Sequence, residues 1–471
     1  MDPLIELALA SQVLVFFMVA AVYLAARQAS LFHPLTWYLA FHGIVFVLRP
    51  LLVFVLNFDA QFTYMEFYPS PEISVLALAA SSTGLVVITG VCLACGRASL
   101  QFPKAPLSAF SREEIRGLLL TTLLFLPAVA FSIFTTRNGI EGERIGGVYV
   151  NTNSVGYLND AQFALMPLLC AWLVVTRFHW LNVGPSLLYV GYRTWFGWSR
   201  WTILLFLVLA VAVYCWHQRI RWMPLWSVFV AVPCLLLFNL LGHNRDALKS
   251  YLQGIPVHSV DFSPGMTTEG RIKKRFDGPD FANFDSLAFI VAMVPARTET
   301  YTYGTQYLQL FTEPVPRKLW KGKPVGAPIS LFNLNSYGNF TGLTNSLCGD
   351  GWMSGGWIGL VVTMVLVGML LGWAHGWFWK HVRNKIGVLF YLTGLAMLPQ
   401  WYRDGSISIA KFMLWNWLPL IVWVTVNWAL GRRLVHSYTL LLPRGAAIPV
   451  IHLPGTRPNG RTKQVVSATA N

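Results

Sequence analysis

The stretch FTEPVPRKLWKGKP, residues 311–324, sets four basic side chains among three prolines. A second stretch, GDGWMSGGWIG at residues 349–359, follows it and runs directly into a long apolar segment. Both close a polar insert from His243 to Asp350, which holds eleven of the 35 Lys and Arg residues and nine of the 20 Asp and Glu residues. In an otherwise apolar chain, we expect the chemistry to take place at this insert.

The rest of the sequence has the composition of a membrane protein. Of its 471 residues 55% are hydrophobic and 12% are charged, whereas a soluble globular chain averages about 25% charged residues. The first apolar stretch is too long for a cleavable signal peptide and lacks a basic leader. We therefore predict an all-α polytopic membrane protein with about eleven transmembrane helices (10–12). The predicted spans are 4–26, 34–57, 73–95, 117–135, 160–176, 179–192, 200–216, 222–242, 356–377, 386–401 and 409–430. The sixth is short for a core of roughly 30 Å, so ten spans with a re-entrant sixth segment is the alternative.

Charges between the spans predict the orientation. Alternate connections are basic, from Arg27 through Arg97 and Arg219 to Lys385, whereas residues 58–72 carry three acidic residues and no Lys or Arg. The positive-inside rule then places the N-terminus outside, the C-terminus in the cytoplasm and the large insert outside. Four parts follow: membrane spans 1–8 at 1–242, an extracytoplasmic catalytic loop at 243–355, spans 9–11 at 356–430, and a basic cytoplasmic tail at 431–471. The net charge of +15 reflects this bias, so no nucleic-acid role is expected.

Several cationic side chains are expected at the outer surface. Arg193 and Arg200 lie seven residues, or two helical turns, apart among aromatic residues. They suit a phosphate clamp, because the guanidinium binds phosphate oxygens in pairs; an interfacial belt of aromatics with snorkelling Arg is the alternative. Arg49 falls inside the second span. It is either functional or a residue that snorkels outward or pairs with Asp59.

The polar insert contains further candidates. Apolar residues at helical spacing predict a helix from about Asn283 to Val294, which Pro295 would end. The cluster Arg317, Lys318, Lys321 and Lys323 suggests recognition of a polyanionic headgroup at the membrane surface. No HExxH, DxD or His/Cys spacing of ligand type occurs, so neither a metal nor another cofactor is predicted.

Three motifs resemble Wzy-type bacterial polysaccharide repeat-unit polymerases. Residues 316–324 resemble that family's "PR..W..KP" signature, residues 349–359 resemble its "GE.Y.NFG..G" stretch, and residues 193–200 resemble its "R…R" turn. Asp350 stands where the family usually has Glu, Trp352 where it has Tyr, and Ser354 where it has Asn. The resemblance in span plan covers nearly the whole chain, and the motifs cover about fifty residues.

The resemblance implies a GT-C-like glycosyltransferase in the bacterial inner membrane. A growing glycan on undecaprenyl diphosphate would be the donor, and one repeat unit on another undecaprenyl diphosphate the acceptor, both at the periplasmic face. Preorganised cations would bind the departing diphosphate in place of a metal. We predict this role for Arg193, Arg200, Arg245, Arg317, Lys323 and Arg403. Asp350 or Asp404 would accept the proton of the attacking hydroxyl or orient an arginine.

Two other functions fit the same features. An O-antigen ligase would share the architecture and the donor but use another acceptor. A transporter or flippase should show internal repeats and ionisable or broken helices at mid-membrane depth in both halves, and no repeat is visible. Expected partners are the lipid-linked glycans and the bilayer, with a chain-length regulator as a candidate.

Overall fold

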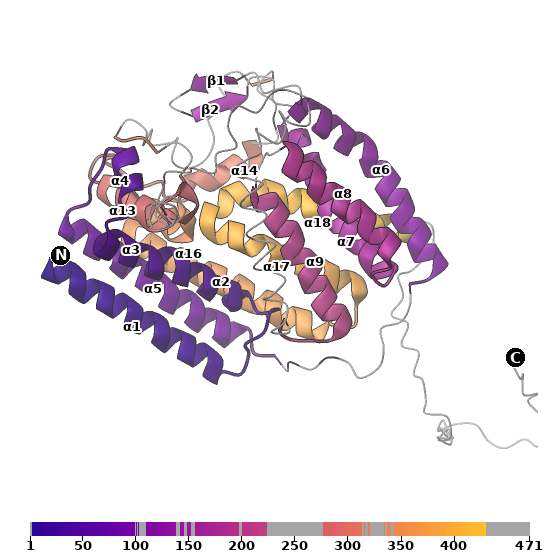
Figure 1. The fold of residues 1–471 in the computed structure, drawn as a ribbon, viewed down its shortest axis with the longest axis horizontal. Helices are drawn as coiled ribbons and strands as arrows, with labels where there is room; N and C mark the ends of the chain where they lie inside the picture. The colour runs from indigo at the N-terminus through magenta and orange to yellow at the C-terminus, as the bar shows by residue number, and fades with distance from the viewer. Residues whose placement is uncertain are drawn as a thin grey trace, which may run out of the picture. The chain divides into compact units, whose positions relative to one another are not determined.

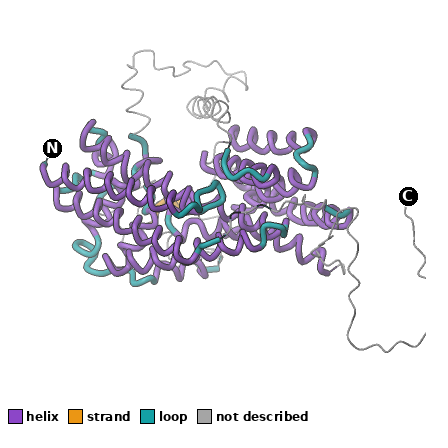
Figure 2. Tube along the Cα trace, turned by 90° about the horizontal axis from the view of Figure 1, so that it is seen from below, coloured by secondary structure: helices purple, strands orange, loops and turns teal. Residues whose placement is uncertain are grey.

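Helices make up nearly all of the chain that the computed structural model describes (Figures 1 and 2). The described residues are 2–98, 100, 102, 110–137, 142–145, 148–151, 156–196, 200–223, 277–312, 315, 319–320, 334, 337–340 and 343–429. Six described helices are long and apolar enough to cross a membrane. They lie at Pro3–Ala25, Pro34–Leu56, Pro71–Cys95, Arg112–Phe134, Ser346–Lys380 and Phe412–Ala429. The chain is therefore a helical, multi-pass membrane protein, as predicted.

Helices occupy ten of the eleven predicted span ranges. The first four are α1 (Pro3–Ala25), a continuous helix of α2 (Pro34–His42), η1 (Gly43–Leu48) and α3 (Arg49–Leu56), α5 (Pro71–Cys95), and α6 (Arg112–Arg137). Next come η2 (Gly156–Ala164) with α7 (Leu165–Val175), α8 (Trp180–Phe196) and α9 (Arg200–Gln218). The last three are α16 (Ser346–Lys380), α17 (Lys385–Asp404) and α18 (Ser406–Ala429). The eighth range, 222–242, lies almost wholly outside the described residues, so the count of eleven spans stays a prediction.

Short elements join these helices. They are α4 (Ala60–Met65), η3 (Pro279–Phe281), α13 (Asn283–Met293), η4 (Thr305–Leu308) and α14 (Gln309–Thr312). The strands β1 (Gly142–Ile145) and β2 (Val148–Asn151) pair antiparallel, with Ile145 opposite Val148. Only a helical fold was predicted, and this hairpin departs from it. Gly146 and Gly147 separate the two strands, and such two-residue connections favour glycine.

Helix starts follow from local sequence. The Asp2 side chain accepts a hydrogen bond from the Leu4 amide at 2.8 Å, and Pro3 follows as the first helical residue of α1. Ser70 and Pro71 repeat this arrangement at the start of α5. Such caps satisfy amides that have no partner inside the helix, and proline fits the first turn because it lacks an amide hydrogen.

The helix α16 is kinked within the Gly-rich motif, at Gly355 and Gly356. Gly356 has a φ of +58°, so the chain changes direction between Ser354 and the membrane-length part of the helix. Carbonyls freed at the kink accept bonds from the segment before η4: Thr302 N to Met353 O at 2.8 Å, and Tyr303 N to Ser354 O at 3.1 Å. A side chain at Gly356 would also meet the Tyr301 hydroxyl. The sequence predicted a span from 356, whereas the helical structure already begins at Ser346.

Close packing joins α5 to α16, which lie side by side in Figure 1. A Cβ atom at Gly372 would lie 2.6 Å from the Cys92 carbonyl, and one at Gly368 would lie 3.0 Å from the Ile88 carbonyl. Small residues allow such backbone contact between membrane helices. These contacts hold the membrane-length part of α16, beyond the kink, against α5.

Connections between the helices gather in two sets. One set comprises 26–33, 96–100, 219–221 and 381–385. Gln28 Nε2 donates to Ala98 O at 3.0 Å, Leu31 N to Arg221 O at 2.9 Å, and Trp216 Nε1 to Val382 O at 3.4 Å. The other set comprises 57–66, 277–312, 337–355 and 403–406, which are joined by the contacts described below. These are the two sets that the charge pattern separates.

Candidate functional site

Asp350 lies buried, with 1% of its surface exposed, where α16 begins beside the turn between α17 and α18. One carboxylate oxygen, Oδ2, accepts the Ser406 amide hydrogen at 2.7 Å, and the other accepts a hydrogen bond from the Asn345 side chain. Ser406 is the first residue of α18. A carboxylate at a helix N-terminus satisfies free amides and complements the helix dipole. Asp350 therefore fixes α18 against the start of α16.

The turn residue Gly405 is required for this contact. Its φ is +82°, a conformation that L side chains rarely adopt, and a Cβ atom there would collide with the Asp350 carboxylate. The turn Arg403-Asp404-Gly405-Ser406 thus meets, through the Ser406 amide, the carboxylate of a residue 56 positions earlier.

We expect Gly405→Ala to lower the free energy of unfolding by about 1–3 kcal/mol, because it adds backbone strain and a clash with Asp350. Thermal unfolding of the purified protein in detergent micelles measures this. The matched control is Gly184→Ala on α8, where a Cβ atom meets nothing within 4 Å. The control should be as stable as the unchanged protein; equal loss in both variants would contradict the role of Gly405.

Arg403 forms the cationic part of the same site. Its Nη2 lies 3.1 Å from Asp280 Oδ1, and its Nη1 lies 3.5 Å from Asp404 Oδ1. Asn283 Nδ2 donates to the Arg403 carbonyl at 2.9 Å. The Arg403 side chain is 9% exposed and that of Asp280 is 49% exposed. The guanidinium is therefore held inside the protein and reaches solvent on the side of Asp280.

Asp404 differs from Asp350 in having one buried carboxylate oxygen that accepts no hydrogen bond from a described residue. Gln400 Nε2 donates to Asp404 Oδ2 at 3.1 Å, while among the described residues Oδ1 accepts no hydrogen bond. Burial raises the pKa of the Asp404 carboxyl above its ordinary value, and Arg403 offsets part of this rise. Of this pair, Asp404 is therefore the carboxylate with an oxygen left to accept a hydrogen bond, whereas each Asp350 oxygen already accepts one.

Tyr307 of η4 adds a hydroxyl to the site. Its oxygen lies close to the side-chain oxygens of Ser354, Thr363 and Ser406. Burial, together with the nearby Asp350 carboxylate, raises the pKa of Tyr307 to about 12. The phenol is therefore protonated at neutral pH and can donate a hydrogen bond. Nothing in the sequence around Tyr307 indicated this position, because the segment from Thr298 to Thr312 carries one charge, at Glu299.

Arg193 of α8 lies against η2, which itself packs on α18. Its Nη1 donates to Gln162 Oε1 at 2.6 Å, and the guanidinium lies 5.6 Å from the centre of the Phe163 ring. Phe163 in turn contacts Phe412 of α18, with ring centres 4.6 Å apart. Arg193 is 4% exposed, so it is buried against η2. Phe412 is six residues, roughly 9 Å along the helix axis, from Ser406 at the Asp350 contact.

The other predicted cations cannot be placed. Arg200 is the first residue of α9, but its side chain is outside the described residues. Arg245, Arg317 and Lys323 lie outside them as well. The structure thus places Arg403 and Asp404 in the turn that Asp350 holds, and it sets Arg193 of α8 against η2, which packs on α18. It adds Asp280, Asn345 and Tyr307, which were not predicted.

Arg49 forms a separate buried ionic cluster. Its Nη2 lies 2.9 Å from Asp277 Oδ1 and 2.8 Å from Asp285 Oδ1, and its Nε donates to Asp285 Oδ2 at 2.9 Å. Arg49 is 1% and Asp285 0% exposed. Among the described residues its salt bridges do not include Asp59, so the predicted pairing with Asp59 and the predicted snorkelling are wrong. Asp59 is nearer to Arg49 in sequence, but the carboxylates that pair with Arg49 are those of Asp277 and Asp285, which lie more than 220 residues away along the chain.

This cluster fixes the polar insert to the bundle. Asp277 Oδ2 accepts the Ala60 amide hydrogen at 3.2 Å, and Gln61 Nε2 donates to the Asp277 carbonyl at 2.7 Å. Asp285 stands in the first turn of α13, whose predicted range is confirmed and whose first nine residues are all buried. Asn283 at the start of α13 holds the Arg403 carbonyl. The ion cluster thereby positions the element that supports Arg403.

Among the residues that the structure describes, no group of three His, Cys, Asp or Glu side chains could hold a metal ion. Fold and site together define a multi-pass helical membrane protein with a buried Arg–Asp cluster at one end of its helices. Comparison of the chain with protein-family models, with curated proteins and with solved structures finds no match.

Proposed function

We propose that this chain is a membrane glycosyltransferase that joins oligosaccharide repeat units carried on undecaprenyl diphosphate. The observation that carries the proposal is the buried Arg403–Asp404 pair, joined through Ser406 to Asp350 and set among the connections opposite the basic ones. An anionic leaving group needs a preorganised cation, and an attacking hydroxyl needs a carboxylate oxygen that accepts its proton. The motif resemblance to repeat-unit polymerases names the substrates.

In this proposal the chain crosses the bacterial inner membrane eleven times. Basic connections face the cytoplasm, together with the C-terminal tail, and the N-terminus and the insert at 243–355 face the periplasm. The site then lies at the periplasmic surface, where lipid-linked sugars can enter from the bilayer with their diphosphates at headgroup depth.

The reaction forms one bond and breaks one. The acceptor hydroxyl oxygen attacks the anomeric carbon of the donor glycan, and the bond from that carbon to the diphosphate oxygen breaks. The diphosphate leaves with the electron pair and stays on its lipid, while the hydroxyl proton passes to Asp404. Arg403 stabilises the developing charge, with Arg193, Arg200, Arg245, Arg317 and Lys323 as further diphosphate ligands. Asp350 positions the turn that carries the reacting groups.

Purified protein in liposomes supplied with lipid-linked repeat units tests this function. We expect a ladder of longer lipid-linked glycans on a gel, with release of undecaprenyl diphosphate. Transfer of single units to a final acceptor without growth would identify a ligase instead. Movement of the lipid-linked unit across the bilayer without a new glycosidic bond would identify a transporter, and either result would overturn the proposal.

The pH dependence should report Asp404. Its carboxylate must be ionised to accept a proton, so the rate should fall as the pH drops through its raised pKa. Asp404→Asn should lower the rate by about 10²–10⁴-fold.

The stability of the protein depends on pH in the opposite direction. A carboxyl group whose pKa is raised on folding contributes stability at a pH below its pKa in the unfolded chain, and this contribution is lost as the pH rises through its pKa in the folded protein. Asp404→Asn should therefore lose activity while keeping its thermal stability at neutral pH. Parallel losses of both would contradict the assigned role.

A further inference from the structure

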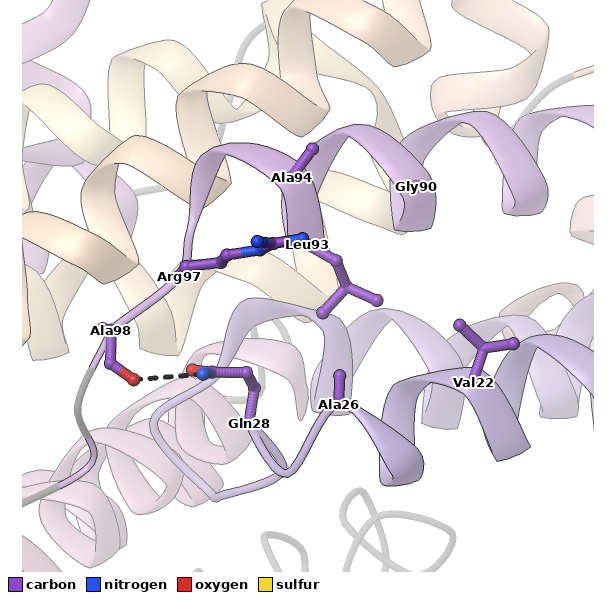
Figure 3. A pocket seen from close by; sticks show the side chains of 8 residues that line it. All are labelled: Val22, Ala26, Gln28, Gly90, Leu93, Ala94, Arg97 and Ala98. Atoms are coloured by element: carbon purple, nitrogen blue, oxygen red, sulfur yellow. Dashed lines mark hydrogen bonds between the residues drawn. The ribbon is translucent and has the colours of Figure 1, made fainter.

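A groove lies between α1 and α5 at the end where the basic connections gather (Figure 3). Its volume is about 740 Å³. The lining residues are Val22, Ala26, Gln28, Gly90, Leu93, Ala94, Arg97 and Ala98. None of them belongs to the site described above, and the groove lies among the opposite set of connections.

One end of the groove is polar. Arg97, which is exposed, extends along the α5 wall beside Leu93, and Gln28 lies across from it (Figure 3). Gln28 Nε2 donates to the Ala98 carbonyl at 3.0 Å, which holds the amide in place. Arg97 follows the C-terminus of α5, where a cation also complements the helix dipole. The charge of Arg97 alone therefore does not indicate a ligand. The groove beside Arg97 is the observation that indicates one.

The other end of the groove is apolar and open. Val22, Ala26 and Leu93 line it, and a Cβ atom at Gly90 would meet nothing within 4 Å. From Gly90 to Arg97 is seven residues, or roughly 10 Å along α5. The groove is thus mainly apolar, with a cation at one end.

The surroundings of the groove match the lipid side of a membrane. Both walls are membrane-length helices, and α1 leaves large apolar side chains exposed along its length, among them Leu14, Phe17 and Val22. The connections at the same end carry Arg27, Arg97, Arg219 and Arg221. Basic residues next to a membrane helix attract anionic lipid headgroups, each by about 1 kcal/mol.

We propose that this groove binds one anionic phospholipid, with its phosphate on Arg97 and Gln28 and an acyl chain lying over Gly90. The apolar end of the groove holds the acyl chain, and Arg97 provides the selectivity for a negatively charged headgroup. This site is independent of the proposed glycosyltransferase reaction, because it uses other residues in the other set of connections.

Native mass spectrometry of the full chain, released from detergent micelles, tests the site. The probes are phosphatidylglycerol and phosphatidylcholine at equal concentrations. We expect the unchanged protein to retain phosphatidylglycerol preferentially. Arg97→Gln should weaken phosphatidylglycerol binding about fivefold and leave phosphatidylcholine binding unchanged. Gly90→Leu fills the apolar end and should weaken both lipids by about tenfold or more.

The matched control is Gly184→Leu on α8, another helical glycine with nothing within 4 Å of its Cβ position. It should bind both lipids as the unchanged protein does. Equal binding of both lipids by the unchanged protein, or full binding by Gly90→Leu, would overturn the proposal. Displacement of the lipid by soluble glycerol phosphate at low concentration would also overturn it, because the acyl chain would then contribute nothing.

Discussion

Arg49→Met is expected to lower the free energy of unfolding by about 3–5 kcal/mol, the usual cost of removing one partner from a buried ion cluster. The change would leave the carboxylates of Asp277 and Asp285 buried without their cation. The segment that begins at Asp277 should separate from α3 and α4 first, because this cluster joins them. Thermal unfolding in micelles gives the stability, and hydrogen exchange of residues 277–293 gives the local opening.

The control for Arg49→Met is a variant of Asp59, which the sequence offered as a partner of Arg49 and which does not pair with it among the described residues. Asp59→Asn removes a carboxylate close to Arg49 in sequence and should leave stability unchanged. Adding Asp277→Asn and Asp285→Asn to Arg49→Met should restore much of the loss, since neutral amides are less costly to bury than unpaired carboxylates. If Arg49→Met unfolds at the same temperature as the unchanged protein, the cluster does not fix the insert.

Arg403→Ala is expected to reduce polymerisation by about 10²–10³-fold, as removal of one preorganised donor to a developing negative charge does in other enzymes. This expected loss of activity rests on the proposed function. Arg403 Nη1 lies 3.5 Å from Asp404 Oδ1, the proposed proton acceptor. The reconstituted assay with lipid-linked repeat units measures the rate and the length of the glycans.

Asp280→Asn separates catalysis from structure at this site. It removes the ion pair of 3.1 Å with Arg403 but keeps the guanidinium, and it keeps the hydrogen bond from Asn283 to the Arg403 backbone carbonyl. We expect its rate to stay within a few-fold of the unchanged protein. Normal glycan length in Arg403→Ala would remove this residue from the site. An equal loss in both variants would assign Arg403 a structural role.

Helix positions were largely predictable, because burial in lipid or among helices needs continuous apolar runs that are visible in one dimension. The range of α13 was predicted from the same periodicity, with Pro295 at its end. The kink at Gly355–Gly356 was not, although glycines marked it. Its cause is a tertiary contact: the amides of Thr302 and Tyr303 take over carbonyls that a straight helix would have used.

The sequence predicted the charged residues of the candidate site but not the residues that contact them. Asp350, Arg403 and Asp404 stood out because charged residues beside apolar spans are costly and therefore conspicuous. Asp280 and Tyr307 did not, since one belongs to an ordinary polar loop and the other to an uncharged aromatic segment. The partner of Arg49 was misjudged for a related reason: proximity in sequence favoured Asp59, and the fold supplied Asp277 and Asp285 instead.

The sequence by itself determined that this is a helical membrane protein and where most of its helices lie, since apolar length and periodicity act locally along the chain. It also separated two sets of connections by charge. The tertiary structure decided which carboxylates meet Arg49 and that Asp350 holds the start of α18. It also decided that one buried oxygen of Asp404 accepts no hydrogen bond from a described residue. The contact of Asp350 with Ser406 spans 56 residues and that of Arg49 with Asp285 spans 236, and no local preference specifies contacts at such separations.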